Sequence, residues 1–162
     1  MDNTIRIVLA DDHPIFRKGL RDTIEEHDEF KVIAEVGDGK SALDQILRLK
    51  PDIAIVDIDM PRLDGLDAAR EVKKLELPTK IIFLTMHTDS EFFDAAFAAG
   101  GQGYILKDSV EDEIVGGIRA VCSGQMYVSP GMTKLLLQKK MAKPARELRV
   151  TDLLKLLQSA ML

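Results

Sequence analysis

Several side chains that suit phosphate chemistry stand where short apolar runs of this sequence end. They are Asp11, Asp12, Asp57, Thr85 and Lys107. Carboxylates held close together repel one another, and they are tolerated together when a cation lies among them. A site made of oxygen ligands favours Mg²⁺, which readily shares phosphate oxygens. A lysine and a hydroxyl beside such an ion complete a cradle for a phosphoryl group. The residue types therefore predict a Mg²⁺-dependent phosphoryl-transfer site.

Asp57 is the best candidate for the group that receives the phosphoryl. It ends the nearly continuous apolar run 53–56, which is typical of a strand buried on both faces of a parallel sheet. Pro61 and the pair Asp64-Gly65 then predict a turn-rich loop. Open α/β sheets bind ligands at the carboxyl ends of their strands, which is where this carboxylate stands. We therefore expect Asp57 to act as the nucleophile that forms an aspartyl phosphate.

Five strand–helix units in strict alternation are expected to position these side chains. The expected strands are 5–10, 31–36, 52–57, 80–84 and 103–106. Helices are expected after each strand, with His13-Pro14 opening the first and with Ser90 and Ser109 as N-caps of the last two. Alternation with short loops predicts right-handed crossovers and an α/β fold whose parallel sheet carries helices on both faces.

Composition sets the class of protein. The chain has 162 residues, of which 46% are hydrophobic and 30% charged, which suits one domain with a short appendage. A net charge of -5 without a basic domain argues against a chain built mainly to lie on nucleic acid or an anionic membrane. The single cysteine, Cys122, excludes an internal disulfide framework and suits a reducing compartment. No apolar run approaches about 20 residues and no secretory signal opens the chain, so we expect no membrane span and a cytoplasmic location.

A second region begins after residue 123. Residues 124–146 are expected to form a linker that contains a helix over 132–140, interrupted by the basic stretch 139–144. Residues 147–162 are expected to be helical, with an apolar face on one side. The residues of that face are Val150, Leu153, Leu154, Leu157 and Met161.

Four motifs in order give the chain a family resemblance. They are IVLADDH, IAIVDIDMPRLDG, IIFLTMH and GYILKD. At these motifs the chain resembles the receiver domain of two-component response regulators, over roughly residues 4 to 123. The resemblance implies a flavodoxin-like (βα)5 receiver fold for residues 1–123, with a five-stranded parallel sheet in the order 2-1-3-4-5, followed by a C-terminal helical extension.

The resemblance also implies roles for individual residues. Asp57 would be the phosphoacceptor, and Asp12 and Asp57 would supply the carboxylates that bind Mg²⁺. Asp59 would offer its backbone carbonyl to the ion, and Asp11 would support the ion through water.

Residues of the fourth and fifth strands would complete the site and the switch. Thr85 and Lys107 would contact the phosphoryl group. On phosphorylation Thr85 would move toward that group, and Tyr104 would turn inward to fill the space. Met86 and His87 follow Thr85, where they would affect access of the phosphodonor and hydrolysis of the phosphoryl group.

The pair Lys107-Asp108 is similar to the NarL/LuxR-type subclass rather than to receivers with Lys-Pro. In that subclass a linker leads to a four-helix DNA-binding domain whose third helix enters the major groove. Residues 147–162 resemble the start of that helix-turn-helix domain, but no recognition helix follows them here. We therefore expect DNA binding only through helices missing from this chain. The expected partners are a sensor histidine kinase and a second copy of the chain.

Two other interpretations compete with a phosphoaccepting receiver. Asp57-Ile58-Asp59 resembles the Asp-x-Asp of haloacid-dehalogenase-type phosphatases, in which Asp59 would be the acid and base, although that motif usually follows the first strand. The second interpretation is a pseudo-receiver that never takes phosphate. The intact set of Asp57, Thr85 and Lys107 argues against it. We expect no enzyme activity beyond slow self-dephosphorylation.

Overall fold

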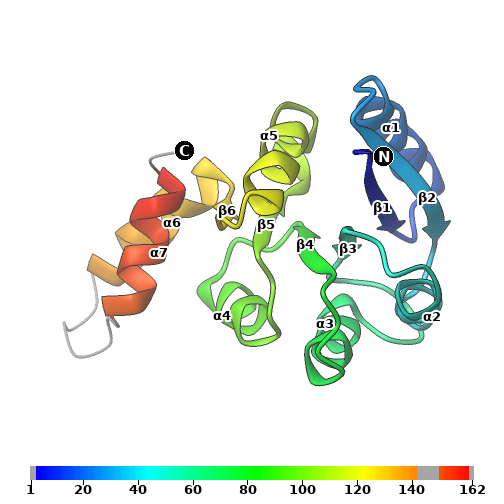
Figure 1. Ribbon diagram of the computed structural model, residues 1–162. Coiled ribbons are helices and arrows are strands. Elements are labelled where there is room, and N and C mark those ends of the chain that lie inside the picture. The colour runs from blue at the N-terminus through cyan, green and yellow to red at the C-terminus, as the bar shows by residue number, and fades with distance from the viewer. Residues whose placement is uncertain (1–2, 142–149, 161–162) are drawn as a thin grey trace.

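Strands and helices alternate through the first part of the chain, as expected (Figure 1). The computed structural model describes residues 3–141 and 150–160. The strands are β1 (Ile5–Ala10), β2 (Phe30–Val36), β3 (Ile53–Asp57), β4 (Lys80–Thr85), β5 (Gly103–Leu106) and β6 (Tyr127–Val128). The helices are α1 (Pro14–Glu25), α2 (Gly39–Leu49), α3 (Gly65–Lys74), α4 (Ser90–Ala98), α5 (Val110–Cys122), α6 (Pro130–Met141) and α7 (Val150–Ala160), with a 3₁₀ turn, η1 (Lys107–Ser109), before α5.

The sheet has the strand order β2-β1-β3-β4-β5-β6, and each pair is parallel. The predicted order 2-1-3-4-5 is confirmed, but the prediction of five strands was wrong by one. The sixth strand, β6, lies in the segment that was expected to be a linker. It pairs with β5 because the Tyr127 N–H donates to the Gln102 carbonyl and the Ser129 N–H donates to the Tyr104 carbonyl. Those bonds cover the edge of β5, which would otherwise present unpaired backbone groups.

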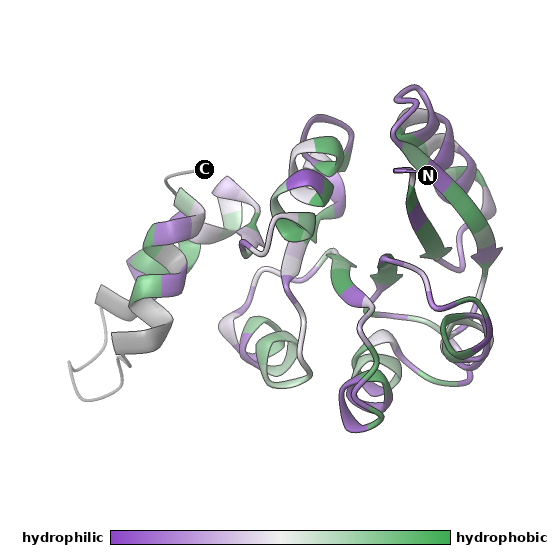
Figure 2. Ribbon diagram, viewed as in Figure 1, coloured by the Kyte–Doolittle hydropathy of each residue, from purple (hydrophilic) through white to green (hydrophobic). Residues whose placement is uncertain are grey.

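Helices pack on both faces of this sheet, and each face has its own apolar core. α1 and α5 cover one face, and α2, α3 and α4 cover the other (Figure 1). Ile7 and Leu9 of β1 point to the first face, while Val8 and Ala10 point to the second, as the two-residue period of a strand requires. Figure 2 shows the consequence, since the strands are mostly hydrophobic and the outer helix surfaces carry the hydrophilic residues.

Side-chain caps begin three of the helices. Asp38, Asp64 and Asp89 each accept a hydrogen bond from a backbone N–H of the helix that follows. The prediction that Ser90 caps α4 was therefore wrong by one residue, because the preceding aspartate takes that position. Ser109 does precede α5, but its side chain makes no capping hydrogen bond.

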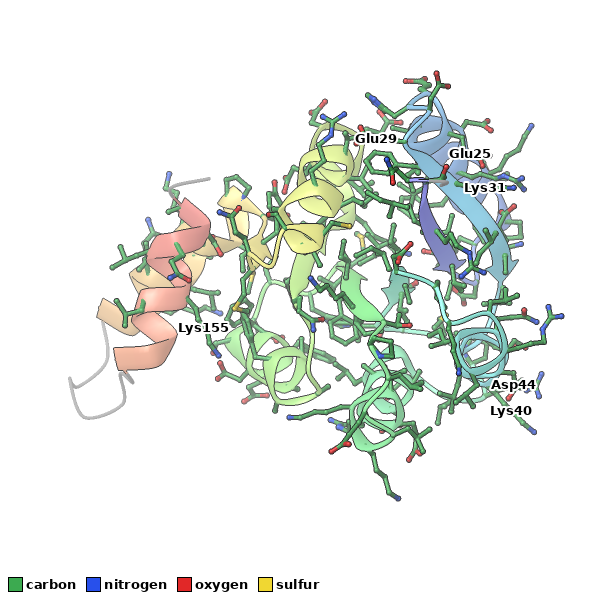
Figure 3. All side chains as sticks on the ribbon, in the orientation of Figure 1. Glu25, Glu29, Lys31, Lys40, Asp44 and Lys155 are labelled. Atoms are coloured by element: carbon green, nitrogen blue, oxygen red, sulfur yellow. The ribbon has the colours of Figure 1, made fainter. Side chains whose placement is uncertain are left out.

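The C-terminal segment packs against the β5 side of the sheet. α6 begins at Pro130, and its Met132 and Leu136 are fully buried in the same core as α4. α7 contacts α6 and β6, and Lys155 Nζ lies 5.2 Å from the ring centroid of Phe97 in α4 (Figure 3). The basic stretch around Lys143 and the end of the predicted apolar face at Met161 lie outside the described residues. Among the described helices, none has the length and apolar character that crossing a membrane requires.

Candidate functional site

The carboxyl ends of four parallel strands bring the predicted polar residues to one edge of the sheet. Asp57 and Thr85 are the last residues of β3 and β4, which are paired. Asp11 follows β1, and Lys107 follows β5. Asp11, Asp57 and Thr85 are buried, with exposed fractions of 0%, 3% and 0%. The edge therefore holds polar side chains that the fold has withdrawn from water.

Lys107 joins the carboxylates. Its Nζ lies 2.7 Å from Asp11 Oδ2 and 2.9 Å from Asp57 Oδ2, and its side chain is 10% exposed. The ring centroid of Phe16 in α1 lies 4.7 Å from the same Nζ, which adds a cation–π contact. Burial works against the ammonium, but the two carboxylates outweigh it and raise the pKa of Lys107. Lys107 is therefore a fixed positive charge between two aspartates.

The surroundings of Asp57 change the pKa of its carboxyl group. Burial raises the pKa of Asp57, the Lys107 ammonium partly opposes this, and the nearby Asp11 adds to the rise. Asp57 Oδ1 also accepts a hydrogen bond from the Asp59 N–H at 3.1 Å. The environment therefore leaves the carboxylate less stabilised than an exposed aspartate, which a cation would correct.

A cation site can form at this edge. Asp11, Asp12, His13 and Asp57 present possible ligand atoms that all lie within 4.8 Å of one another. Asp11 Oδ2 is buried without a hydrogen bond of good geometry, although Lys107 is its close neighbour. Three carboxylates form the oxygen-rich donor set that Mg²⁺ prefers, so the residues present fit that ion.

His13 is a further member of this cluster, although from the sequence it was expected only at the start of the first helix. Its N–H donates to Asp11 Oδ1 at 2.8 Å, and its Nδ1 lies 3.1 Å from Asp11 Oδ1 and 3.0 Å from Asp12 Oδ1. Its place directly after the aspartate pair was the available signal that it also lies at the site.

Thr85 lies beside a second contact network in the β4–α4 loop. Thr85 Oγ1 accepts a hydrogen bond from the His87 N–H at 2.8 Å. His87 Nε2 lies 2.6 Å from Asp59 Oδ2, and its ring stacks on Phe92 with centroids 3.7 Å apart. The Asp59 carboxylate is thus engaged with His87, while Met86 beside it is 62% exposed.

Tyr104, the predicted switch residue, already points inward. Its side chain is 2% exposed, and its O–H donates to the His87 carbonyl at 3.1 Å. It packs edge-to-face on Phe93 of α4, with ring centroids 5.3 Å apart. Burial raises the pKa of Tyr104 to about 12. The structure thus brings Asp11, Asp12, Asp57 and Lys107 into contact distance, with Thr85 and Tyr104 on the adjoining strands.

Comparison with known proteins agrees with this arrangement. The family model described as response regulator receiver domain matches residues 7–119. The chain is 31% identical over 137 residues to the transcriptional regulatory protein DegU of Brevibacillus brevis, covering 85% of this chain and 58% of DegU. It is 34% identical over 128 residues to the regulatory protein NarL of Mycobacterium tuberculosis, covering 79% of this chain and 59% of NarL. The chain thus spans about three fifths of the length of these relatives.

Solved structures agree as well. A two-component response regulator of the LuxR family from Aurantimonas superposes with a TM-score of 0.81 at 35% identity, covering 85% of this chain and 99% of that one. The NarL receiver domain from Mycobacterium tuberculosis gives a TM-score of 0.74 at 34% identity, covering 76% and 99%. The flavodoxin-like receiver fold is therefore confirmed. The chain belongs to the response regulator receiver family, as the match over residues 7–119 and the similar LuxR-family structures show.

Proposed function

We propose that this receiver accepts one phosphoryl group on Asp57 from a sensor histidine kinase. The observation that carries the proposal is Lys107, whose ammonium lies within 2.9 Å of both Asp11 and Asp57 at the carboxyl edge of the sheet. A cation held between buried carboxylates is what a transferring phosphoryl group needs for charge neutralisation. Asp12 adds a third carboxylate to Asp11 and Asp57, and this set of oxygen ligands suits Mg²⁺.

The transfer exchanges one bond for another. A carboxylate oxygen of Asp57 forms a bond to phosphorus as the bond from phosphorus to the donor breaks, and the electron pair leaves with the donor group. Lys107 neutralises charge on the phosphoryl oxygens, and the Thr85 hydroxyl donates one hydrogen bond to them. Asp12, Asp57, the Asp59 carbonyl and, through water, Asp11 would hold Mg²⁺, and the bound ion would supply further charge neutralisation.

The output of the switch is control of transcription. The similar protein DegU is a transcriptional regulatory protein, and NarL is a probable one. Phosphorylation of the receiver would shift the protein toward a homodimer in the cytoplasm. Leu154 and Leu157 of α7 are 53% and 45% exposed and offer apolar area to a second copy. DNA would be bound by helix-turn-helix helices other than those that residues 3–141 and 150–160 form. Sedimentation with and without phosphodonor tests the assembly, and a monomer in both states would contradict it.

Acetyl phosphate with Mg²⁺ tests phosphoryl acceptance directly. Intact mass should show one phosphoryl group on the wild type and none on Asp57→Asn, because the amide is a poor nucleophile. The matched control is Asp52→Asn, whose carboxylate lies at the opposite edge of the sheet and accepts from the Arg6 N–H. It should gain the group as the wild type does. A gain of equal size in Asp57→Asn would contradict the proposal.

The same sample separates the two competing interpretations. We expect one stoichiometric phosphorylation and slow self-dephosphorylation, with no turnover of a phosphate monoester such as p-nitrophenyl phosphate. Turnover would favour the phosphatase interpretation, in which Asp59 acts as acid and base. No mass gain from acetyl phosphate, and no stabilisation by beryllium fluoride, would favour a pseudo-receiver.

A further inference from the structure

The C-terminal segment is hydrogen-bonded to the strand that leads to Lys107. The Tyr127 N–H donates to the Gln102 carbonyl at 3.0 Å, and the Ser129 N–H donates to the Tyr104 carbonyl at 2.9 Å. These bonds run along the outer edge of β5 toward its carboxyl end. The backbone ladder thus ends close to the turn that carries the active-site lysine.

The Ser129 side chain continues that ladder. Its hydroxyl accepts a hydrogen bond from the Leu106 N–H at 2.9 Å and donates one to Glu113 Oε1 at 2.6 Å. Leu106 directly precedes η1, and Glu113 lies in the first turn of α5, which directly follows η1. A single hydroxyl therefore ties together the two sides of the turn that begins with Lys107.

Glu113 has a second donor from the same segment. The Tyr127 O–H donates to Glu113 Oε1 at 3.0 Å. Burial and the neighbouring carboxylate raise the pKa of Tyr127, so this phenol keeps its proton. We call the hydrogen-bonded set Leu106, Glu113, Tyr127 and Ser129 the Ser129 clasp. Its central residue, Ser129, has an exposed fraction of 0%, while Glu113 and Tyr127 are half-buried, so water does not reach the Ser129 hydroxyl.

Ser129 also precedes the helix α6, whose buried residues lie in the same core cluster as the switch residue Tyr104. Its carbonyl accepts hydrogen bonds from the Met132 and Thr133 N–H groups, both at 2.9 Å. Met132 is fully buried in the core cluster that contains Tyr104. The residue that braces the Lys107 turn thus lies directly before α6 and accepts hydrogen bonds from its first turn.

We infer that Ser129, through Glu113, is a positioning residue for Lys107, so that the segment after α5 completes the phosphoryl site. The inference rests on the proposed phosphoryl acceptance at Asp57. Lys107 must stay within hydrogen-bond distance of Asp57, and small misplacements of such a group are costly. Because coupling between two sites is reciprocal, a phosphoryl group that engages Lys107 also changes the stability with which β6 and α6 dock.

The rate of phosphoryl uptake from acetyl phosphate with Mg²⁺ in the full chain tests the positioning role. Ser129→Ala should lower this rate about tenfold, because the Lys107 turn loses its brace. Glu113→Ala should lower it similarly. Glu113→Gln, which keeps an oxygen acceptor, should restore most of the rate. Glu111→Ala in the same helical turn and Ser123→Ala near the end of α5 are the controls, and both should stay within twofold of the wild type.

A double-mutant cycle separates positioning from a merely structural role. If Ser129 acts through Lys107, then Ser129→Ala should cause no further loss in a Lys107→Met background. An unchanged rate for Ser129→Ala, or an equal loss in both backgrounds, would overturn the inference. No phosphoryl uptake by the wild type would contradict the proposed function, whereas equal uptake by the wild type and Ser129→Ala would contradict the inference alone, so the two failures are distinguishable.

Amide hydrogen exchange gives a readout that needs no phosphodonor. In Ser129→Ala the Leu106 and Lys107 amides should exchange at least about tenfold faster, while β1 amides keep the rate of the wild type. Equal protection of Leu106 in both proteins would show that the clasp does not hold the turn, and would overturn the inference even where phosphorylation is normal.

Discussion

The two ends of the parallel sheet carry the same residue types and use them differently. The carboxyl edge has Asp57, Thr85 and Lys107. The amino edge has Asp52, Thr79 and Lys80, which lie directly before β3 or at the start of β4. Residue type alone therefore does not distinguish a reactive edge from a structural one.

At the amino edge each polar group is used by the backbone. Asp52 Oδ2 accepts from the Arg6 N–H at 2.8 Å, and the Thr79 hydroxyl donates to the Pro51 carbonyl at 2.7 Å. Lys80 Nζ donates to the Val121 carbonyl at 3.0 Å. A hollow of ≈ 380 Å³ lies there, yet its polar side chains tie strand ends together. A cavity lined by Asp and Lys is thus no sign of chemistry by itself.

At the carboxyl edge the side chains face one another instead. Lys107 contacts two carboxylates, and Asp12 stands beside them with its side chain 34% exposed. The loops after β1, β3 and β4 each donate one backbone N–H, to Asp11 Oδ1, Asp57 Oδ1 and Thr85 Oγ1. The difference is that the carboxyl edge keeps two carboxylate oxygens, Asp11 Oδ2 and Asp57 Oδ2, which a lysine rather than the backbone engages.

The largest expected effect contrasts the two lysines. Lys107→Met should slow phosphoryl uptake by at least about 100-fold, the scale of losing one charge-stabilising donor at a transferring group. Lys80→Met should change the rate by less than about twofold, because Lys80 donates to the end of α5 rather than to a carboxylate. The measurement is intact mass against time with acetyl phosphate and Mg²⁺.

Circular dichroism and thermal unfolding are the controls for both lysine variants. Lys107→Met leaves Asp11 and Asp57 buried beside each other, so its folding must be shown before its rate is interpreted. A comparable loss of rate in both variants would remove the contrast between the edges, since it would show that general destabilisation slows the transfer.

Much of the carboxyl edge was predictable because its signals are local. Each strand is a short apolar run, and the polar residue that ends it, such as Asp57 or Lys107, lies at the same edge as the others once the sheet is parallel. Alternation of strands and helices predicts that sheet directly. The parallel sheet predicts that Asp11, Asp57 and Lys107 lie at one edge, but β4 separates β3 from β5, so the contacts of Lys107 with the two carboxylates are a tertiary result.

The β6 edge was not predictable, because its interactions join residues far apart in the sequence and leave no local signal. Tyr127–Val128 is a two-residue strand, which is too short to show any hydrophobic period. The bond from Leu106 to Ser129 joins residues 23 positions apart, and no local pattern marks it. The inward position of Tyr104 is likewise a tertiary result, since it depends on a loop carbonyl at His87 and on Phe93.

Mg²⁺ should stabilise the fold through the carboxyl edge alone. At a free Mg²⁺ concentration about five times the dissociation constant, the wild type should gain ~1 kcal/mol of unfolding free energy. Asp12→Asn should lose most of this gain, because it removes one of three clustered carboxylates. Asp52→Asn should keep it. Urea unfolding with Mg²⁺ and with EDTA measures the difference, and a full gain in Asp12→Asn would place the ion elsewhere.

The smallest expected effect is on the free energy of unfolding, which Asp57→Asn and Asp52→Asn should change in opposite directions. Asp57→Asn should raise the free energy of unfolding at pH 7 by about 0.5 kcal/mol without Mg²⁺. Burial and the nearby Asp11 disfavour the Asp57 carboxylate, while an amide oxygen still accepts from Lys107. Asp52→Asn should instead lose a little stability, because a carboxylate is the stronger acceptor for the Arg6 N–H.

The pH dependence fixes the cause of that gain. The pKa of Asp57 is raised above its ordinary value of 3.8, so the folded chain holds this proton more tightly than the unfolded chain. The resulting stability is fully present below the unfolded pKa and is lost as the pH rises through the folded pKa. The advantage of Asp57→Asn should therefore grow from pH 4 to pH 7 in urea unfolding at constant ionic strength. An advantage that stays constant would show that shape, rather than the buried charge, separates the two edges.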